Sequence, residues 1–207
     1  MPTENERKYV LNLKCESNFK NCSIFLKKYF LHQGYLAFSK GTTLRLRSSQ
    51  EYKYKNFGSM NQFEDYPDPE IKRKLCFKQK VNGRVIEIEK KIDERDFNDL
   101  WNNCLNKVQK ERYVYETSSV CWDIDFFKHN NQTYFAMAEC EMPENMIEPE
   151  TIPDIISQNL LYAVSLDDPQ FSTKRLACLV YAKKMYKKLK NAKKENFSQE
   201  NFNKVKN

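Results

Sequence analysis

Charged residues recur two positions apart in stretches that otherwise have the composition of β-strands. Successive side chains of a strand point to opposite faces, so residues i and i+2 share one face. Leu44 and Leu46 alternate with Arg45 and Arg47, which sets a charged face against an apolar one. The stretches with this pattern are Glu4/Glu6/Lys8, Arg45/Arg47, Lys78/Lys80, Glu87/Glu89, Lys110/Arg112, Asp123/Asp125 and Glu139/Glu141.

These stretches are sorted by sign, because most of them carry only bases or only acids. The polar face of an ordinary half-buried sheet looks at water and has little reason to sort its charges. The sorting therefore predicts a surface shaped for a polyanion held together with metal cations. For any single pair a solvated strand face is the simpler interpretation. For Glu87/Glu89 an ion pair with the adjacent Lys90 or Lys91 is a further alternative.

The length of 207 residues is enough for one well-buried domain. No apolar run approaches the roughly 20 residues that span a bilayer, and the charged segment 1–8 does not resemble a signal peptide. We therefore expect a cytoplasmic protein without a membrane partner. The seven cysteines are irregularly spaced and include no CxxC pair, which predicts free thiols rather than disulfides or a zinc site.

The net charge of +7 is concentrated near the C-terminus, where nine lysines between Lys183 and Lys206 face only Glu195 and Glu200. The rest of the chain is close to neutral, so a nucleic-acid surface over the whole fold is weakly supported. We interpret the lysine run as a solvated helix face, with RNA or an acidic partner as the alternative. The expected organisation is a domain over 1–190 and a tail over 191–207, frayed beyond about Glu195.

The hydrophobic patterns predict mostly antiparallel strands, about eight in number, and a few helices. The Asn82-Gly83 pair between two alternating runs predicts a hairpin, and Asp93 is a suitable N-cap. The segment 50–68 has little periodicity, so we expect a long mobile loop or lid there. Strands are predicted over 4–14, 35–38, 42–48, 74–81, 85–92, 109–116, 120–128 and 133–142, and helices over 17–33, 94–107, 153–162 and 172–190. The expected fold is α+β, an eight-stranded barrel with charges inside and helices packed outside.

The charged pairs also occur in the order of a known family. The chain opens with the ExExK pattern at 4–8, followed by Leu-Arg-Leu-Arg at 44–47, Phe77-Lys78, the Glu87/Glu89, Lys110/Arg112 and Glu139/Glu141 pairs, the Asp-bearing strand 122–126 and the segment 168–172. As a set, over about residues 4–185, these motifs resemble the CYTH superfamily of triphosphate tunnel metalloenzymes. The resemblance implies an eight-stranded tunnel that binds a triphosphate with one or two divalent cations, Mg²⁺ or Mn²⁺.

The resemblance also implies a role for each matching residue. Carboxylates are the hard oxygen ligands that Mg²⁺ and Mn²⁺ prefer, and bases hold phosphate oxygens. The implied metal ligands are Glu4, Glu6, Asp125, Glu139 and Glu141, with Glu87 and Glu89 as an acidic wall. The implied phosphate-binding residues are Lys8, Arg45, Arg47, Lys78, Lys80, Lys110 and Arg112, and the implied catalytic residues are Lys8, Glu139 and Glu141. Asp123 is expected near the rim, and Ile86 stands where the family commonly has an arginine, with Arg84 two positions earlier.

The function expected from this resemblance is metal-dependent hydrolysis of a triphosphate, in which an ordered water attacks the terminal phosphorus. The substrate would be inorganic triphosphate, a nucleoside triphosphate, thiamine triphosphate or an RNA 5′-triphosphate end, the last being the one form of nucleic acid expected as a partner. A class IV adenylate cyclase that makes cyclic AMP from ATP is an alternative, as is a non-catalytic binder of nucleotides or polyphosphate. We expect a monomer or a homodimer.

Overall fold

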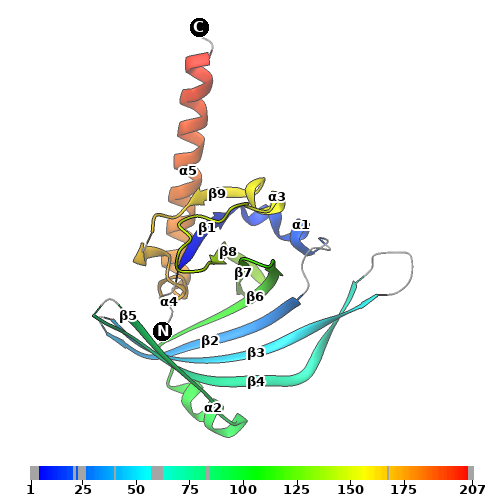
Figure 1. Cartoon of the computed structure of the whole chain (residues 1–207), viewed down its shortest axis with the longest axis vertical. Coiled ribbons are helices and arrows are strands. Elements are labelled where there is room, and N and C mark those ends of the chain that lie inside the picture. Colours follow the sequence, from blue (N-terminus) through cyan, green and yellow to red (C-terminus); the bar gives the residue numbers. More distant parts are fainter. Residues whose placement is uncertain are drawn as a thin grey trace.

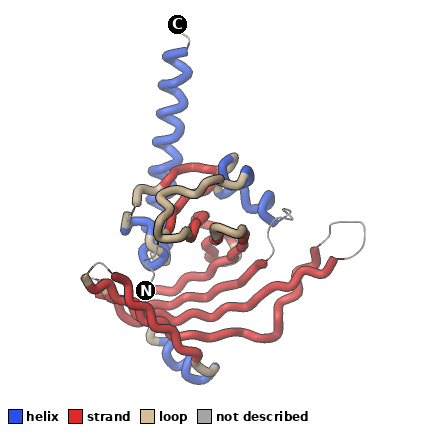
Figure 2. Tube along the Cα trace, viewed as in Figure 1, coloured by secondary structure: helices blue, strands red, loops and turns tan. Residues whose placement is uncertain are grey.

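The computed structural model describes residues 5–20, 22, 27–39, 41–56, 63–82, 84–166 and 168–204. They form an antiparallel sheet of nine strands with a few helices, so the α+β class is confirmed (Figures 1 and 2). The strands are β1 (Glu6–Leu11), β2 (Lys27–Ser39), β3 (Thr42–Asn56), β4 (Phe63–Val81), β5 (Arg84–Lys91), β6 (Asn106–Glu116), β7 (Cys121–His129), β8 (Gln132–Glu141) and β9 (Leu160–Ala163). The helices are α1 (Glu16–Lys20), α2 (Glu94–Asn102), α3 (Asp154–Ser157), α4 (Thr173–Leu176) and α5 (Leu179–Lys204), with 3₁₀ turns η1 (Leu13–Cys15) and η2 (Pro169–Phe171).

The strand order is β5-β4-β3-β2-β6-β7-β8-β1-β9, and every pairing is antiparallel. The sheet curves strongly, with its concave side toward α4 and the start of α5 (Figure 1). Strands β5 and β9 are its edges and do not pair with each other in the described part of the chain. The expected closed eight-stranded barrel is thus realised as a curved nine-stranded sheet.

Local sequence signals located several elements correctly. Asn82 has a φ of 49° in the β4–β5 turn, a left-handed conformation that asparagine tolerates. The Asp93 side chain accepts a hydrogen bond from the Asp96 amide at 2.8 Å and caps α2, which ends earlier than predicted, at Asn102. None of the helices in the described residues combines the length and apolar character needed to cross a membrane.

The helix predicted over 17–33 is wrong beyond its first turn. Residues 16–20 are helical in α1, but 27–39 form β2, which pairs with β3 on one side and β6 on the other; residues 21 and 23–26 lie outside the described residues. Both faces of β2 are covered, because Leu31 and Tyr35 are buried on one and His32 stacks on Trp101 of α2 on the other. Such a strand has apolar residues at helix-like spacings as well as at period two. Leu31, Gln33 and Tyr35 are all buried on one face.

The loop predicted over 50–68 is also wrong where the structure describes it. Strand β3 continues to Asn56 and β4 starts at Phe63, with Tyr52 opposite Pro67; residues 57–62 lie outside the described residues. Strand β5 covers β4 only from Lys74 onward, so Pro67 lies where β4 pairs on one side only. A proline is tolerated there because no second ladder requires its missing N–H.

The C-terminal helices also differ from the prediction. The segment predicted as helical over 153–162 divides into α3 and β9, and the segment over 172–190 divides into α4 and α5. Helix α5 then continues to Lys204, past the point where fraying was expected.

The concave face of the sheet is divided into an apolar part and a charged part. Buried residues of β1, β6, β7 and β8 pack with Leu176 of α4 and Ala182 of α5: they are Val10, Val108, Phe127, Phe135 and Met137. The same face of these strands carries charged residues two positions away from the apolar ones, toward the other end of the sheet. They are Lys8, Lys110, Asp125 and Glu139. The helices thus fill one end of the concave face, and the charged end beyond it forms the site described next. A second apolar cluster, around Trp122 and Ile124, lies on the opposite face under α1 and α3.

Candidate active site

The charged end of the concave face encloses a cavity of about 500 Å³ to which strands β1 to β8 all contribute. It brings together most of the residues singled out in the sequence. The lining residues are Glu6, Lys8, Gln33, Tyr35, Thr43, Arg45, Arg47, Cys76, Lys78, Glu87, Glu89, Lys110, Arg112, Asp123, Glu139, Glu141, Ser172, Thr173 and Lys174.

The acids of β1, β7 and β8 form one wall. Glu6 lies directly opposite Glu141 in the β1–β8 ladder, and Asp123 lies directly opposite Glu139 in the β7–β8 ladder. Like charges directly opposite each other across a pair of strands repel, so both pairings are unfavourable without nearby cations. The wall therefore requires positive charge between its carboxylates.

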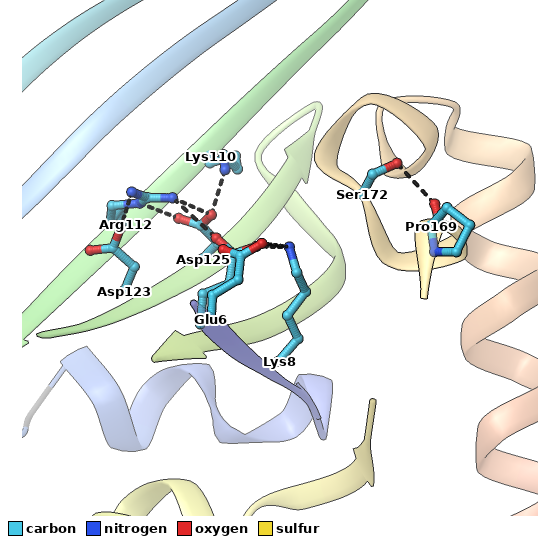
Figure 3. Close-up of polar contacts among 9 residues, drawn as sticks. Glu6, Lys8, Lys110, Arg112, Asp123, Asp125, Pro169 and Ser172 are labelled. Atoms are coloured by element: carbon cyan, nitrogen blue, oxygen red, sulfur yellow. Dashed lines mark hydrogen bonds and ion pairs between the residues drawn. The ribbon is translucent and has the colours of Figure 1, made fainter. Parts of the chain in front are cut away.

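Lys8 supplies part of that positive charge. Its Nζ lies 2.7 Å from Glu6 Oε1 and 2.9 Å from Glu139 Oε1 (Figure 3 shows Lys8 beside Glu6). Burial lowers the pKa of Lys8, but the carboxylates of Glu139 and Glu6 outweigh burial and raise it above its ordinary value. Lys8 therefore stays protonated and links the carboxylates of Glu6 on β1 and Glu139 on β8.

Arg112 is held by two aspartates of β7 (Figure 3). Its Nε and Nη2 donate to Asp125 Oδ1 and Oδ2 at 2.6 and 2.7 Å, and its Nη1 donates to Asp123. Lys110 also donates to Asp125, which is completely buried. Burial raises the pKa of Asp125, but Arg112 and Lys110 outweigh it and hold that pKa well below its usual range.

Asp125 thus lies behind the cavity wall, with both oxygens occupied by cationic donors. These contacts hold Arg112 in place, and the metal-ligand role that the resemblance implies for Asp125 stays a prediction. Lys110 is similarly deep: burial lowers its pKa to about 8, although Asp125 acts in the other direction. Its predicted contact with phosphate would have to be made from the floor of the cavity.

Asp123, expected near the rim, is among the residues that line the cavity. Burial raises its pKa to about 6, and the neighbouring Asp125, Glu139 and Glu141 act in the same direction against Arg112. The acidic wall contributes four carboxylates and three bases to the lining, so negative charge predominates there: Glu6, Asp123, Glu139 and Glu141 against Lys8, Lys110 and Arg112. Carboxylate oxygens with unbalanced charge suit a hard divalent cation, so the residues present fit Mg²⁺ or Mn²⁺.

The opposite wall, from β2, β3 and β4, has the reverse imbalance. When the Gln33 amide oxygen faces Arg47, it accepts hydrogen bonds from Arg47 Nε and Nη2 at 2.9 and 3.1 Å. The buried Gln33 is a neutral partner, so it does not balance the charge of Arg47. Burial lowers the pKa of Arg47 to about 10, and the nearby guanidinium groups of Arg45 and Arg112 contribute. This wall contains more positive charge than its acids neutralise.

Glu87 and Glu89 lie beside the basic wall. Their oxygens and the Sγ of Cys76 lie within 4.8 Å of one another, and Cys76 donates to Glu87 at 3.0 Å. Glu89 pairs with Lys74 at 2.5 Å, and Glu87 pairs with Lys78 at 3.4 Å. Within the part of the chain that the structure describes, these glutamates thus form ion pairs with bases of β4 and with Arg45 at 3.7 Å, rather than with Lys90 or Lys91.

Among the described site residues that were predicted, Asp125 and Lys80 are not part of the lining, and Lys80 is exposed near the β4–β5 turn. Glu4 lies outside the described residues. Sequence reasoning missed Thr43 and Cys76, although each precedes a selected base by two positions and shares its face. It also missed Gln33, which was predicted to end a helix, and Tyr35, which was predicted to begin a strand. It missed Ser172, Thr173 and Lys174, which only the tertiary fold brings to the cavity.

Neither a protein-family model nor a curated protein matches the sequence. Among solved structures, the hypothetical protein NE1496 is 21% identical over 84% of this chain and 97% of its own, with a TM-score of 0.48. The PH1819 protein from Pyrococcus horikoshii is 20% identical over 75% and 85%, with a TM-score of 0.46. A Bacillus halodurans protein described as a candidate adenylate cyclase is 11% identical over 70% and 82%, with a TM-score of 0.41. These likenesses assign no function, and the proposals below rest on the residues of this chain.

Proposed function

We propose that this protein hydrolyses a triphosphate in the charged cavity with the help of Mg²⁺ or Mn²⁺. The observation that carries the proposal is the opposite imbalance of the two walls. Among the lining residues, acids outnumber bases on the acidic wall, and bases outnumber acids on the basic wall. The first wall has Glu6, Asp123, Glu139 and Glu141 against Lys8, Lys110 and Arg112, and the second has Arg45, Arg47 and Lys78 against Glu87 and Glu89. A metal cation at the first wall and a phosphate chain at the second would neutralise both at once.

The composition of the lining supports a metal–phosphate pair over either ion alone. Seven basic and six acidic side chains line the cavity, so its charges nearly cancel overall, although acids predominate on one wall and bases on the other. A simple anion would be repelled by the acids and a simple cation by the bases. A phosphate chain that carries its own metal presents both signs, and the volume of about 500 Å³ is typical of small-molecule sites.

The residues of the chain would divide the work by wall. Arg45 and Arg47 would bind phosphate oxygens with paired N–H groups, and Lys78 would act as a point charge. Glu6, Glu139 and Glu141 would hold the metal, with Asp123 beside them. Arg112, fixed in place by Asp125, would stabilise charge that develops on the transferred phosphoryl group. A bound Mg²⁺ or Mn²⁺ would polarise phosphate oxygens and lower the pKa of a coordinated water.

The test is a product analysis with the full chain. The protein is incubated with Mg²⁺ or Mn²⁺ and with inorganic triphosphate, ATP, GTP, thiamine triphosphate or a 5′-triphosphorylated RNA, and orthophosphate, pyrophosphate and cyclic AMP are quantified. We expect orthophosphate from at least one substrate. Cyclic AMP as the main product would replace hydrolysis with cyclisation. Binding of these compounds without turnover would contradict hydrolysis and favour a non-catalytic binding protein.

A matched pair of variants locates the activity. Glu139→Gln removes a carboxylate of the acidic wall and should lower kcat by at least about 100-fold, because electrostatic stabilisation of this kind typically contributes that much. Glu94→Gln makes the same change on exposed α2, where Glu94 pairs with Arg73, and should leave kcat unchanged. Equal activity of the two variants would exclude Glu139 from the proposed metal site.

A further inference from the structure

The C-terminal part of the chain has a charge of one sign that the cavity does not use. Between Pro169 and Lys194 the sequence contains nine basic residues and no acidic one. Helix α5 carries most of them and extends away from the sheet (Figure 1). A run of like charges this long on a folded helix calls for an explanation beyond solubility.

Five of these bases lie on the solvent side of α5. Lys183, Lys184, Lys187, Lys188 and Lys190, here called the lysine face, are all exposed. At 3.6 residues per turn they fall within an arc of about 160° around the helix. Lys193 is set apart from them, since its Nζ donates to the carbonyl oxygen of Leu160 at 2.5 Å. The lysine face is thus a continuous cationic strip along about two turns of helix.

Over residues 182–189 the opposite side of α5 packs against the fold. Ala182 is buried, and Met185, Tyr186 and Leu189 pack against the apolar cluster that includes Phe135. The Tyr186 hydroxyl also accepts a hydrogen bond from the Leu13 amide at 3.1 Å. Insertion into a lipid surface would need this apolar side, which is already packed against the sheet, so over residues 183–190 the helix presents its lysines to a partner.

The lysine face is electrostatically unfavourable on its own. Lys183 and Lys187, like Lys184 and Lys188, are spaced i,i+4, and like charges at that spacing destabilise a helix. Within the described residues no carboxylate forms an ion pair with any of the five lysines. A bound polyanion would remove this repulsion, whereas a small anion would reach only one or two of the lysines.

We propose that the lysine face binds the phosphate backbone of a nucleic acid without sequence preference. A phosphodiester chain supplies regularly spaced charges along the length of such a strip. Lysine ammonium groups contact phosphates as point charges and do not by themselves specify bases. No aromatic side chain belongs to the lysine face, so base stacking contributes nothing. This binding is independent of the function proposed for the cavity.

The test measures the salt dependence of binding. A labelled single-stranded 20-mer RNA with a 5′-hydroxyl end is titrated with the full chain, without divalent cations, by fluorescence anisotropy at 50–200 mM NaCl. Five phosphate contacts predict a slope of log K against log[salt] of about −3.5, since each contact to a single strand contributes about −0.7. A DNA arm of the same sequence identifies the source: equal affinity assigns the shared phosphodiester backbone, and tighter RNA binding assigns a contribution from the 2′-hydroxyl.

Two triple variants with equal loss of charge make the test specific. Lys184→Gln/Lys187→Gln/Lys188→Gln should reduce the slope to about −1.4 and weaken binding at 50 mM NaCl at least about tenfold. The control Lys72→Gln/Lys90→Gln/Lys91→Gln changes three exposed lysines of β4 and β5 and should bind like the unmodified protein. Equal weakening in the control, a slope near zero, or binding to phosphatidylserine vesicles but not to either nucleic acid would overturn the proposal.

Discussion

Asp125→Asn should be the most destabilising single substitution of a charged residue in the cavity region. Asp125 is completely buried and accepts hydrogen bonds from Lys110 and from two nitrogens of Arg112. The substitution removes the negative charge but keeps the side-chain volume, so it leaves the buried Lys110 and the partly buried Arg112 with one neutral acceptor. Removing one partner of a buried ion pair typically costs about 3–5 kcal/mol.

The structure places the expected loss of unfolding free energy near the lower end of that range. Lys110 already has a pKa lowered to about 8 and can release its proton when Asp125 is neutralised. Arg112 cannot, but it retains Asp123 and lies 3.7 Å from Glu139. A loss of about 3 kcal/mol is a large part of the roughly 5–15 kcal/mol typical of a domain, yet leaves a folded protein.

Urea unfolding followed by far-UV circular dichroism and tryptophan fluorescence measures the loss, with the buried Trp122 of β7 as a nearby reporter. At about 2 kcal/mol per molar urea, the midpoint should fall by about 1.5 M. Because the folded-state pKa of Asp125 is depressed, its contribution is fully present above the unfolded value near 3.9. The difference between the two proteins should therefore shrink as the pH falls below about 4.

A double-mutant cycle tests whether the buried charges are the cause. The double variant Asp125→Asn/Lys110→Met removes the Lys110 ammonium group together with the Asp125 charge. Its loss of unfolding free energy should therefore be about 0.5–3 kcal/mol smaller than the sum of the losses of the two single variants. Asp99→Asn, on the exposed side of α2, is the matched control and should stay within about 0.5 kcal/mol. Additive losses, or an Asp125→Asn midpoint equal to that of the control, would refute the reasoning.

Three further outcomes are expected. Gly34→Ala should cost about 1–3 kcal/mol in urea unfolding, because the new Cβ would lie 2.5 Å from Cys104 Sγ and 2.8 Å from Trp101 Cζ3; an unchanged midpoint would contradict this packing. Glu16→Gln should cost about 1–3 kcal/mol at pH 7, since Glu16 pairs with the buried Lys128 at 2.5 Å. Burial would raise the pKa of Glu16, but Lys128 and its other hydrogen-bond donors lower it to about 2, so the difference should vanish as the pH falls from about 4.5 to 2. Mn²⁺ at 100 times its dissociation constant should raise the unfolding free energy by about 2.7 kcal/mol, reversed by a chelator, and no shift in melting temperature would argue against a metal site.

The sequence alone was sufficient to assign side chains to faces. The period-two spacing of Arg45/Arg47, Glu87/Glu89 and Glu139/Glu141 placed each pair on one side of a strand, and all six residues line the cavity. Turn and cap chemistry worked for the same reason, since Asn82 and Asp93 act through atoms within a few residues of themselves. Strand faces, turns and caps depend on residues close together in the sequence, so they can be predicted from it.

Only the tertiary structure decided how deep each charge lies and which strands meet. Asp123 and Asp125 share a face, yet one lines the cavity and the other is buried behind it, because depth depends on where the helices α4 and α5 stop filling the concave face. Strand β2 looked helical for a related reason: its apolar residues serve two covered faces, and its position between β3 and β6 is a long-range pairing. Burial and pairing are set by segments far apart in the chain, and no local pattern encodes them.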